Sequence, residues 1–298
     1  MTEELSTDAV LVLHPRTEVA VAEYIARPHL PVLIVGPAGS GKASLAARIA
    51  RELLTQGATE HAAARLAYLH SVRPEDGKAI PVEAVRELQH LLTLSLPAKD
   101  MRQIKRVIVI EDAHRMTLEA QNALLKTLEE PPVGTAMLLT APTADAMLPT
   151  VQSRVQQLVV LPPAAEALEA HLMARGFDKQ AIGKAMLLSG ELPGLATAVL
   201  TDDESHPLLQ ATLHARGILQ STTYERLLLV DGLSKQKDLC LDVLFVLTQM
   251  SRVSLLRATS VSAGDKWRRI LSASHEATGQ LRHNAQAKLV LTNLMLAF

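Results

Sequence analysis

The chain has 298 residues, of which 48% are hydrophobic, 20% charged and 2% aromatic, and its formal net charge is −1. This length exceeds the size at which one hydrophobic core stops growing, so we expect two or three folded units and not a disordered chain. The near-zero charge argues against nucleic-acid binding driven by a general positive field, and the few aromatic side chains argue against a stand-alone single-strand-binding module.

The first expected elements are a strand, a glycine-rich loop and a helix. The run 31–35 is short, apolar and β-branched and ends at a glycine, which is typical of a buried parallel strand. Between Gly41 and Leu54 the apolar residues recur at helical spacing without a proline, which predicts a helix.

The same alternation continues to residue 161. Pro81 can open a helix, and a further helix through Leu124 must stop at the proline pair Pro131 and Pro132. About five strands with intervening helices predict an α/β fold with a parallel, doubly wound sheet, whose ligand should bind at the carboxyl ends of the strands. The expected strands are 31–35, 67–72, 106–110, 137–140 and 157–161.

Beyond Pro163 the β-branched runs become sparse and the chain reads as helical segments rich in Leu and Ala. Glycines and prolines separate a few short helices up to an acidic linker at 201–204. We therefore expect an α/β domain at 1–163, a small helical domain at 164–202 and a larger helical domain at 203–298.

The cysteine content and the N-terminus bear on location. The single cysteine, Cys240, lies in an apolar run, so no intrachain disulfide and no multi-cysteine zinc site can form. The segment Met1 to Glu4 is acidic where a signal peptide is basic, and no uninterrupted apolar stretch approaches the ~20 residues of a membrane span. The sequence predicts a cytoplasmic protein that has no membrane segment.

The loop after the first strand carries the clearest motif of the chain. It fits G-x-x-x-x-G-K, in which backbone amides cradle phosphates and the lysine reaches the terminal phosphates. Because it lies between a predicted strand and a predicted helix, we interpret it as a phosphate loop that binds ATP. Its residues are Gly36, Pro37, Ala38, Gly39, Ser40, Gly41 and Lys42.

The two residues after the lysine depart from the full motif. A hydroxyl is expected directly after the lysine, because it binds the Mg²⁺ that bridges the phosphates. Here that residue is Ala43, and Ser44 is turned about 100° further around the helix. We still count Ala43 and Ser44 among the nucleotide-binding residues, and the sequence therefore predicts nucleotide binding with inefficient hydrolysis.

Two carboxylates, Glu111 and Asp112, follow the strand 106–110. Carboxylates at such a strand end can orient Mg²⁺ and position water, so we assign them as candidate ligands of nucleotide-bound Mg²⁺ and Asp112 as a candidate catalytic residue. Plain turn formation is the alternative. The histidines, including His114, show no metal-ligand spacing, and none is assigned a catalytic role.

The segment 107–132, VIVIEDAHRMTLEAQNALLKTLEEPP, resembles the signature region of bacterial DNA polymerase III clamp-loader subunits of the AAA+ family. The stretch 122–132 is close to the family's sequence motif, and 80–88 resembles a helix that comes earlier in the family's sequence. The resemblance covers roughly residues 10 to 200. It implies an AAA+ nucleotide-binding domain, a helical lid and a helical collar for the three expected domains.

The resemblance also implies roles for two further residues. Ser153, Arg154 and Val155 stand where the family has Ser-Arg-Cys, whose arginine reaches a neighbouring subunit's nucleotide, so Arg154 would be an arginine finger acting in trans. An ordinary surface salt bridge is the alternative for Arg154. Thr140, preferred over Thr143, would correspond to the polar γ-phosphate sensor.

Several departures from the family's motors indicate a weak nucleotide site. The family's Asp-Glu order is exchanged at residues 111 and 112, and Pro193 stands in the lid-like segment 190–195 where motors have a phosphate-contacting arginine. The four-cysteine zinc module of many relatives is excluded by the lone Cys240. With Ala43, this profile resembles the delta-prime branch of the family more than the gamma/tau motors.

The resemblance implies a hetero-pentameric clamp loader whose other subunits, sliding clamp and primed DNA are the partners. This chain would help ATP-dependent clamp loading with weak or absent ATPase activity of its own. Two alternatives stay open: an autonomous AAA+ motor of the branch-migration type, against which Ala43 argues, and a P-loop phosphotransferase.

Overall fold

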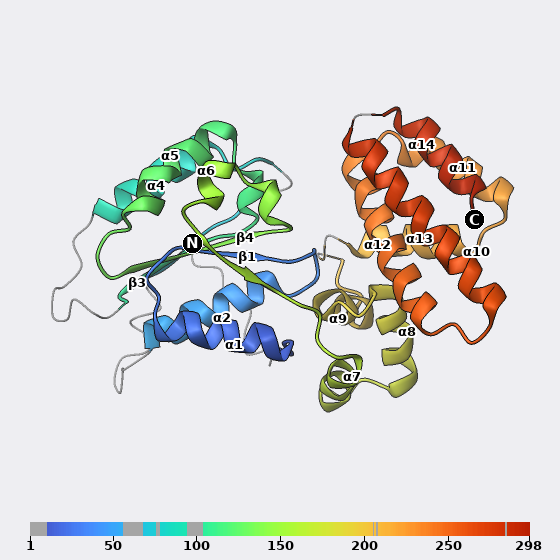
Figure 1. Cartoon of the computed structure of the whole chain (residues 1–298), viewed down its shortest axis with the longest axis horizontal. Coiled ribbons are helices and arrows are strands. Elements are labelled where there is room, and N and C mark those ends of the chain that lie inside the picture. Colours follow the sequence, from blue (N-terminus) through green and yellow to red (C-terminus); the bar gives the residue numbers. More distant parts are fainter. Residues whose placement is uncertain are drawn as a thin grey trace. The chain divides into compact units, whose positions relative to one another are not determined.

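The computed structural model of the chain describes residues 11–55, 68–75, 78–93, 104–204, 206, 208–283 and 285–298. The chain forms two compact units that follow one another in sequence, with the division between Leu161 and Pro162. The first unit contains a sheet and helices, and the second is built from helices (Figure 1).

In the described part of the first unit, the sheet has five strands in the order β2-β3-β4-β1-β5. Every neighbouring pair is parallel. The predicted α/β class with a parallel sheet is thus confirmed, although Ala67, the first residue of the second expected strand, lies outside the described residues. The strands are β1 (Val32–Val35), β2 (Leu69–Val72), β3 (Arg106–Ile110), β4 (Thr135–Ala141) and β5 (Gln156–Val159).

Helices of the first unit follow the strands, and α1 precedes them. The sequence patterns gave no prediction for α1, which begins at Pro15 after the capping residue His14, whose Nδ1 accepts the N–H of Arg16 at 3.1 Å. The described helices are α1 (Pro15–Ala26), α2 (Lys42–Thr55), α4 (Val82–Thr93), η1 (Ala113–Arg115), α5 (Leu118–Glu129), η2 (Ala144–Ala146) and α6 (Pro149–Gln152).

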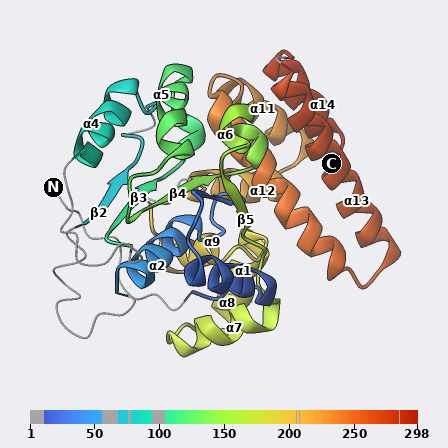
Figure 2. The same cartoon turned by 60° about the vertical axis from the view of Figure 1, so that its left-hand side comes forward.

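Alternating side chains of β1 supply both faces of the sheet with buried apolar groups. Val32 and Ile34 pack into the core formed with α1 and α2, whereas Leu33 and Val35 pack into the core formed with α4, α5 and α6. Successive residues of a strand point to opposite faces, so a continuously apolar strand requires helices on both sides. Figure 2 shows these two helical layers with the sheet between them.

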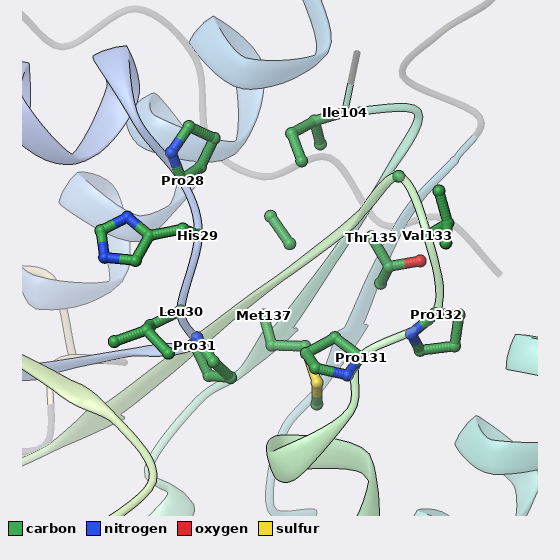
Figure 3. Close-up of a pocket in the computed structure, with 12 residues that line it drawn as sticks. Pro28, His29, Leu30, Pro31, Ile104, Pro131, Pro132, Val133, Thr135 and Met137 are labelled. Atoms are coloured by element: carbon green, nitrogen blue, oxygen red, sulfur yellow. The ribbon is translucent and has the colours of Figure 1, made fainter. Parts of the chain in front are cut away.

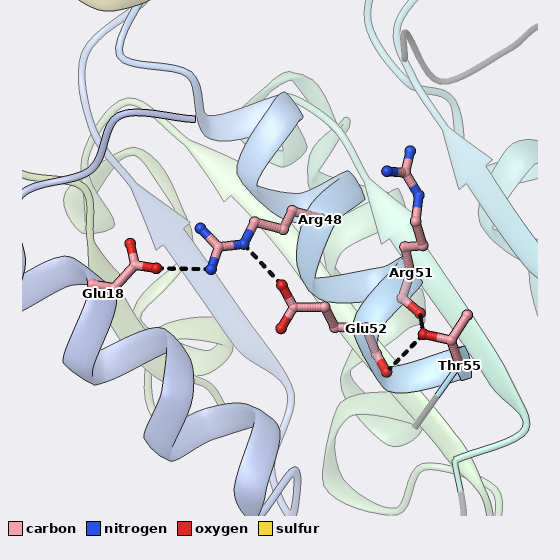
Figure 4. A network of polar contacts seen from close by, with 5 residues as sticks. All are labelled: Glu18, Arg48, Arg51, Glu52 and Thr55. Carbon is pink, nitrogen blue, oxygen red and sulfur yellow. Dashed lines mark hydrogen bonds and ion pairs between the residues drawn. The ribbon is translucent and has the colours of Figure 1, made fainter. Parts of the chain in front are cut away.

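Polar contacts tie α1 to the helix that follows the phosphate loop. The guanidinium of Arg48 donates to Glu18 on α1 at 2.7 Å and to Glu52 one turn further along α2 at 2.8 Å. Thr55 continues the series by donating to the backbone carbonyls of Arg51 and Glu52 (Figure 4). All three ionic side chains are partly exposed, so these ion pairs contribute little to the stability of the fold.

The second unit is helical throughout its described residues. Its helices are α7 (Ala165–Ala174), α8 (Lys179–Ser189), α9 (Pro193–Thr201), α10 (Leu209–Gln220), α11 (Thr223–Leu233), α12 (Lys237–Leu256), α13 (Val261–Arg282) and α14 (Ala287–Leu296). Helices α7, α8 and α9 share a small apolar core, and α12 packs against both α10 and α13. The assignment of 164–202 as a lid and 203–298 as a collar stays a prediction.

Glycine ends α8 at a point where another backbone approaches closely. Gly190 is the C-cap residue of α8 with φ 62°, a left-handed conformation that favours glycine. A Cβ at this position would lie 2.3 Å from the Cβ of Gln249 on α12. Pro193, the residue in place of the motors' arginine, is the first residue of α9.

Among the described residues, α12 is the one helix whose length and composition would allow it to cross a membrane, with a mean hydropathy of 1.6. Half of that apolar window is buried inside the protein. The core helix of a soluble protein passes the same test, and α12 packs between other helices of its unit. Length and composition are therefore weak evidence for a membrane span here.

Candidate functional site

The glycine-rich loop connects the carboxyl end of β1 to the first residue of α2. The N–H of Gly36 donates to the carbonyl of Ala141 at 3.2 Å, which ties the loop to the end of β4. Gly39 and Gly41 have φ values of 76° and 87°, which glycine adopts without steric penalty. A loop of this kind presents backbone amides and the positive end of the helix dipole to an anion.

Lys42 already has an acceptor within the loop, because its amine donates to the carbonyl of Pro37 at 2.9 Å. The side chain is buried, and this burial lowers the pKa of Lys42 to about 8, although the negative charge of Asp112 acts in the opposite direction. A phosphate at the loop would favour the charged amine and raise its pKa. A nucleotide would therefore have to compete with the Pro37 carbonyl for Lys42.

The loop is closely packed around Gly36 and Ser40. A Cβ at Gly36 would lie 2.8 Å from Ser40 Oγ and 3.2 Å from the Cβ of Val160, so a larger residue would force one of them to move. The Ser40 hydroxyl is buried and has no hydrogen-bond partner among the described residues. A buried hydroxyl without a partner is costly, and a phosphate oxygen at the loop could satisfy it.

The residues for Mg²⁺ fit less well than those for phosphate. Ala43 has no hydroxyl, and both Ala43 and Ser44 are exposed on the first turn of α2. Glu111 and Asp112 lie at the end of β3, where burial raises the pKa of Glu111 above its ordinary value. The described residues contain no group of three His, Cys, Asp or Glu side chains that could hold a metal ion.

The adjacent strands β3 and β4 bring two of the predicted residues into contact. The Asp112 N–H donates to Thr140 Oγ1 at 2.9 Å, and Asp112 has a left-handed φ of 46°. Thr140 is buried in β4, whereas Thr143, the alternative sensor, is exposed before η2. The hydroxyl of Thr140 thus accepts a hydrogen bond from the turn that carries Asp112.

Thr140→Val is expected to destabilise the protein by about 1–3 kcal/mol, because valine keeps the shape but leaves the Asp112 N–H without its acceptor. Thr143→Val is the matched control, and its effect should stay within about 0.5 kcal/mol because the side chain is exposed. Urea unfolding of both variants measures the difference. Equal stability of the two would mean that the Thr140 hydroxyl does not fix this turn.

His114, to which the sequence assigned no role, lies in the same region as Lys42 and Asp112. Burial lowers its pKa, the charge of Asp112 raises it, and the charges of Arg115 and Lys42 lower it further. Its Nδ1 is buried and has no hydrogen-bond partner among the described residues. His114 follows Glu111 by three residues, and this short spacing is the sequence signal that could have placed the imidazole at the site.

Arg154 lies two residues after the end of α6, and its guanidinium makes contacts within its own chain. Nε donates to Oε1 of Glu129 at 2.7 Å, and Nη2 makes an ion pair with the same oxygen. Nη1 donates to the carbonyl of Thr150 at 2.8 Å and to the hydroxyl of Ser153 at 3.1 Å. Glu129, at the end of α5, is a partner that the sequence did not predict.

The sheet separates Arg154 from the phosphate loop. Gln156 pairs with Val32 and Val159 with Val35, so β5 runs toward the edge of the sheet where the loop lies. Arg154 precedes the amino end of β5, and four strand residues span about 13 Å. The predicted finger therefore lies at the amino ends of the strands and the predicted phosphate loop at their carboxyl ends. Arg154 is not part of the loop site of its own chain.

A pocket of about 240 Å³ also lies at the amino edge of the sheet (Figure 3). The loop 28–31, the loop 131–134 and the first residues of β4 line it together with Ile104. The described residues that line it are proline-rich and include no lysine, arginine or carboxylate. The pocket is distinct from the phosphate loop, which lies at the carboxyl edge.

Comparison with known proteins points to one family. Residues 25–164 match the family described as "DNA polymerase III, delta subunit". The DNA polymerase III subunit delta' of Pseudomonas aeruginosa is 32% identical over 220 residues, which are 68% of this chain and 60% of that protein. The subunit delta' of Escherichia coli is 32% identical over 206 residues, covering 64% of this chain and 60% of the relative.

The chain thus spans about 60% of the length of these two relatives. A solved structure of a DNA polymerase III gamma subunit-related protein from Thermotoga maritima aligns with 94% of this chain and 97% of its own, at 19% identity and a TM-score of 0.49. The family match and the two delta' identities agree with the predicted resemblance. The chain belongs to the delta-prime-like family of DNA polymerase III clamp-loader subunits.

Proposed function

We propose that this chain is a clamp-loader subunit of the replicative DNA polymerase and acts in the cytoplasm. Its partners would be the other loader subunits in a hetero-pentamer, together with the sliding clamp and primed DNA. The observation that carries this proposal is the identity of 32% to delta' subunits over 68% of the chain. The retained Arg154, at the sheet edge opposite its own loop, supports it further.

In the proposed role the chain's own nucleotide site is weak. The loop residues 36–42 could receive the phosphates of ATP, with Lys42 moving from the Pro37 carbonyl to a phosphate oxygen. Ala43 provides no hydroxyl for Mg²⁺, and Asp112 and Thr140 are bound to one another through the turn after β3. Slow or absent hydrolysis follows from the missing metal ligand.

The chain's main catalytic contribution in this proposal is made through Arg154 to a neighbouring subunit. A guanidinium beside the γ-phosphate stabilises the charge that spreads over its oxygens during phosphoryl transfer. ATP binding around the ring would favour the state that opens the clamp, and primed DNA would trigger hydrolysis. This division of roles matches a chain that keeps the finger and loses the metal-binding hydroxyl.

Reconstitution tests the proposal. The full chain should co-purify with the remaining loader subunits, and the isolated chain should show little or no steady-state ATP hydrolysis because Ala43 lacks the hydroxyl ligand. The assembled complex should hydrolyse ATP faster when primed DNA and clamp are added. Robust turnover by the isolated chain would instead favour the autonomous motor, and failure to assemble would refute the loader role.

A further inference from the structure

Glu129 holds the predicted finger in its own subunit. Its Oε1 accepts from both Nε and Nη2 of Arg154, although the two residues are 25 positions apart in sequence. Glu129 is the last residue of α5, and Arg154 follows the short helix α6. The fold therefore brings the two charges together, and their neutralisation is a property of the folded unit.

The contacts leave Arg154 little capacity for another ligand. A guanidinium has five N–H donors in a fixed fork. Nε and one N–H of Nη2 bind Glu129, and Nη1 binds the Thr150 carbonyl and the Ser153 hydroxyl. One N–H of Nη2 is then available, which does not allow the bidentate contact that arginine forms with a phosphate.

We propose that Glu129 is a latch on Arg154, which must open before the arginine can act on a neighbouring subunit's γ-phosphate. This inference rests on the proposed finger role of Arg154. Release of the Glu129 carboxylate frees Nε and Nη2 together, and these two adjacent donors form the face of the fork that matches two phosphate oxygens. Glu129 is thus a positioning residue that restrains the finger.

The geometry is suited to a reversible latch. The side chains of Arg154 and Glu129 are 32% and 48% exposed, so both can be reached by an approaching subunit and by water. Exposed ion pairs of this kind are weak and open readily. The contacts of Nη1 with Thr150 and Ser153 do not involve the carboxylate, so they could keep the side chain in place while the latch opens.

The test is Glu129→Gln in the assembled loader, because glutamine keeps the size of the side chain and removes its charge. ATP hydrolysis in the absence of DNA is expected to rise about two- to fivefold, which corresponds to the strength of an exposed ion pair, and the stimulation by DNA should shrink accordingly. Glu130→Gln is the matched control. Glu130 is the exposed neighbour of Glu129, and Arg154 makes its contacts with the carboxylate of Glu129.

The double variant Glu129→Gln with Arg154→Ala separates the latch from the proposed function. It should behave as Arg154→Ala alone, since a latch has no effect once the finger is absent. Unchanged or reduced DNA-independent hydrolysis in Glu129→Gln, with Arg154→Ala still defective, overturns the latch and leaves the finger intact. If Arg154→Ala has full activity, the finger role itself fails. Thermal unfolding of each variant confirms that the fold is retained.

Discussion

Replacing Arg154 by alanine is expected to abolish the contribution of one ATP site in the assembled loader while leaving the site of this chain unchanged. An arginine finger accounts for about 10³-fold or more in the rate of phosphoryl transfer, so hydrolysis at the neighbouring site should fall to background. Single-turnover hydrolysis by the reconstituted complex, with primed DNA and clamp, measures that loss. Nucleotide binding by this chain should be unaffected, because Arg154 lies at the sheet edge away from the loop.

Two further variants test whether the loss of hydrolysis is specific to the guanidinium of Arg154. Arg154→Lys keeps the charge but loses the planar fork, so it should restore only a small part of the activity. Arg86→Ala removes another exposed arginine of the same unit, on α4, and should have no effect. Equal hydrolysis by wild type and Arg154→Ala would contradict the finger assignment and leave Arg154 as a surface partner of Glu129.

Gly190→Ala is expected to have the largest effect on the stability of the helical unit. The new Cβ would lie 2.3 Å from the Cβ of Gln249 and 3.1 Å from its carbonyl carbon, and the backbone of α12 cannot give way as a flexible side chain would. The left-handed φ of 62° adds strain for any residue with a Cβ. From the steric clash and the backbone strain together, we expect the free energy of unfolding to fall by about 2–4 kcal/mol.

Fluorescence of Trp267 can follow this loss, because it is the chain's single tryptophan and lies on α13 in the same unit. Gly183→Ala is the matched control on α8, where an added Cβ would meet no atom within 4 Å. Alanine at that interior helical position should stabilise the unit by up to about 1 kcal/mol. A urea midpoint of Gly190→Ala equal to that of wild type would mean that α8 and α12 are not held at this distance.

The sequence predicted the sheet well because hydrophobic runs, and the glycines that end them, are local signals. The strand at Arg106–Ile110 and the loop helix from Lys42 appear where the patterns put them. The patterns gave no prediction for α1, although it has 12 residues, as α4 and α5 do, and its Glu18 contacts Arg48 of α2. Expected element ends, such as residue 161 for β5, differ by two residues from the observed end at Val159.

The candidate site was predictable only in part. The loop and the strand-end carboxylates follow from motif spacing, and their proximity follows from the rule that ligands bind at the carboxyl ends of parallel strands. The contact between Glu129 and Arg154 joins residues distant in sequence, so no periodicity could indicate it. Likewise, the bond from Lys42 to the Pro37 carbonyl depends on loop conformation, which the motif does not determine.

The parallel sheet has a consequence for how such chains can assemble. Because Arg154 precedes β5 and the phosphate loop follows β1, a chain that uses Arg154 as a finger would present the arginine and the loop at opposite ends of its strands. Two copies related by a two-fold axis would bring identical surfaces together. The arginine of one copy would then not meet the phosphate loop of the other. In the proposed role, contacts made through this arginine would therefore be heterologous and would give the assembly a direction, so that each subunit has two different neighbours.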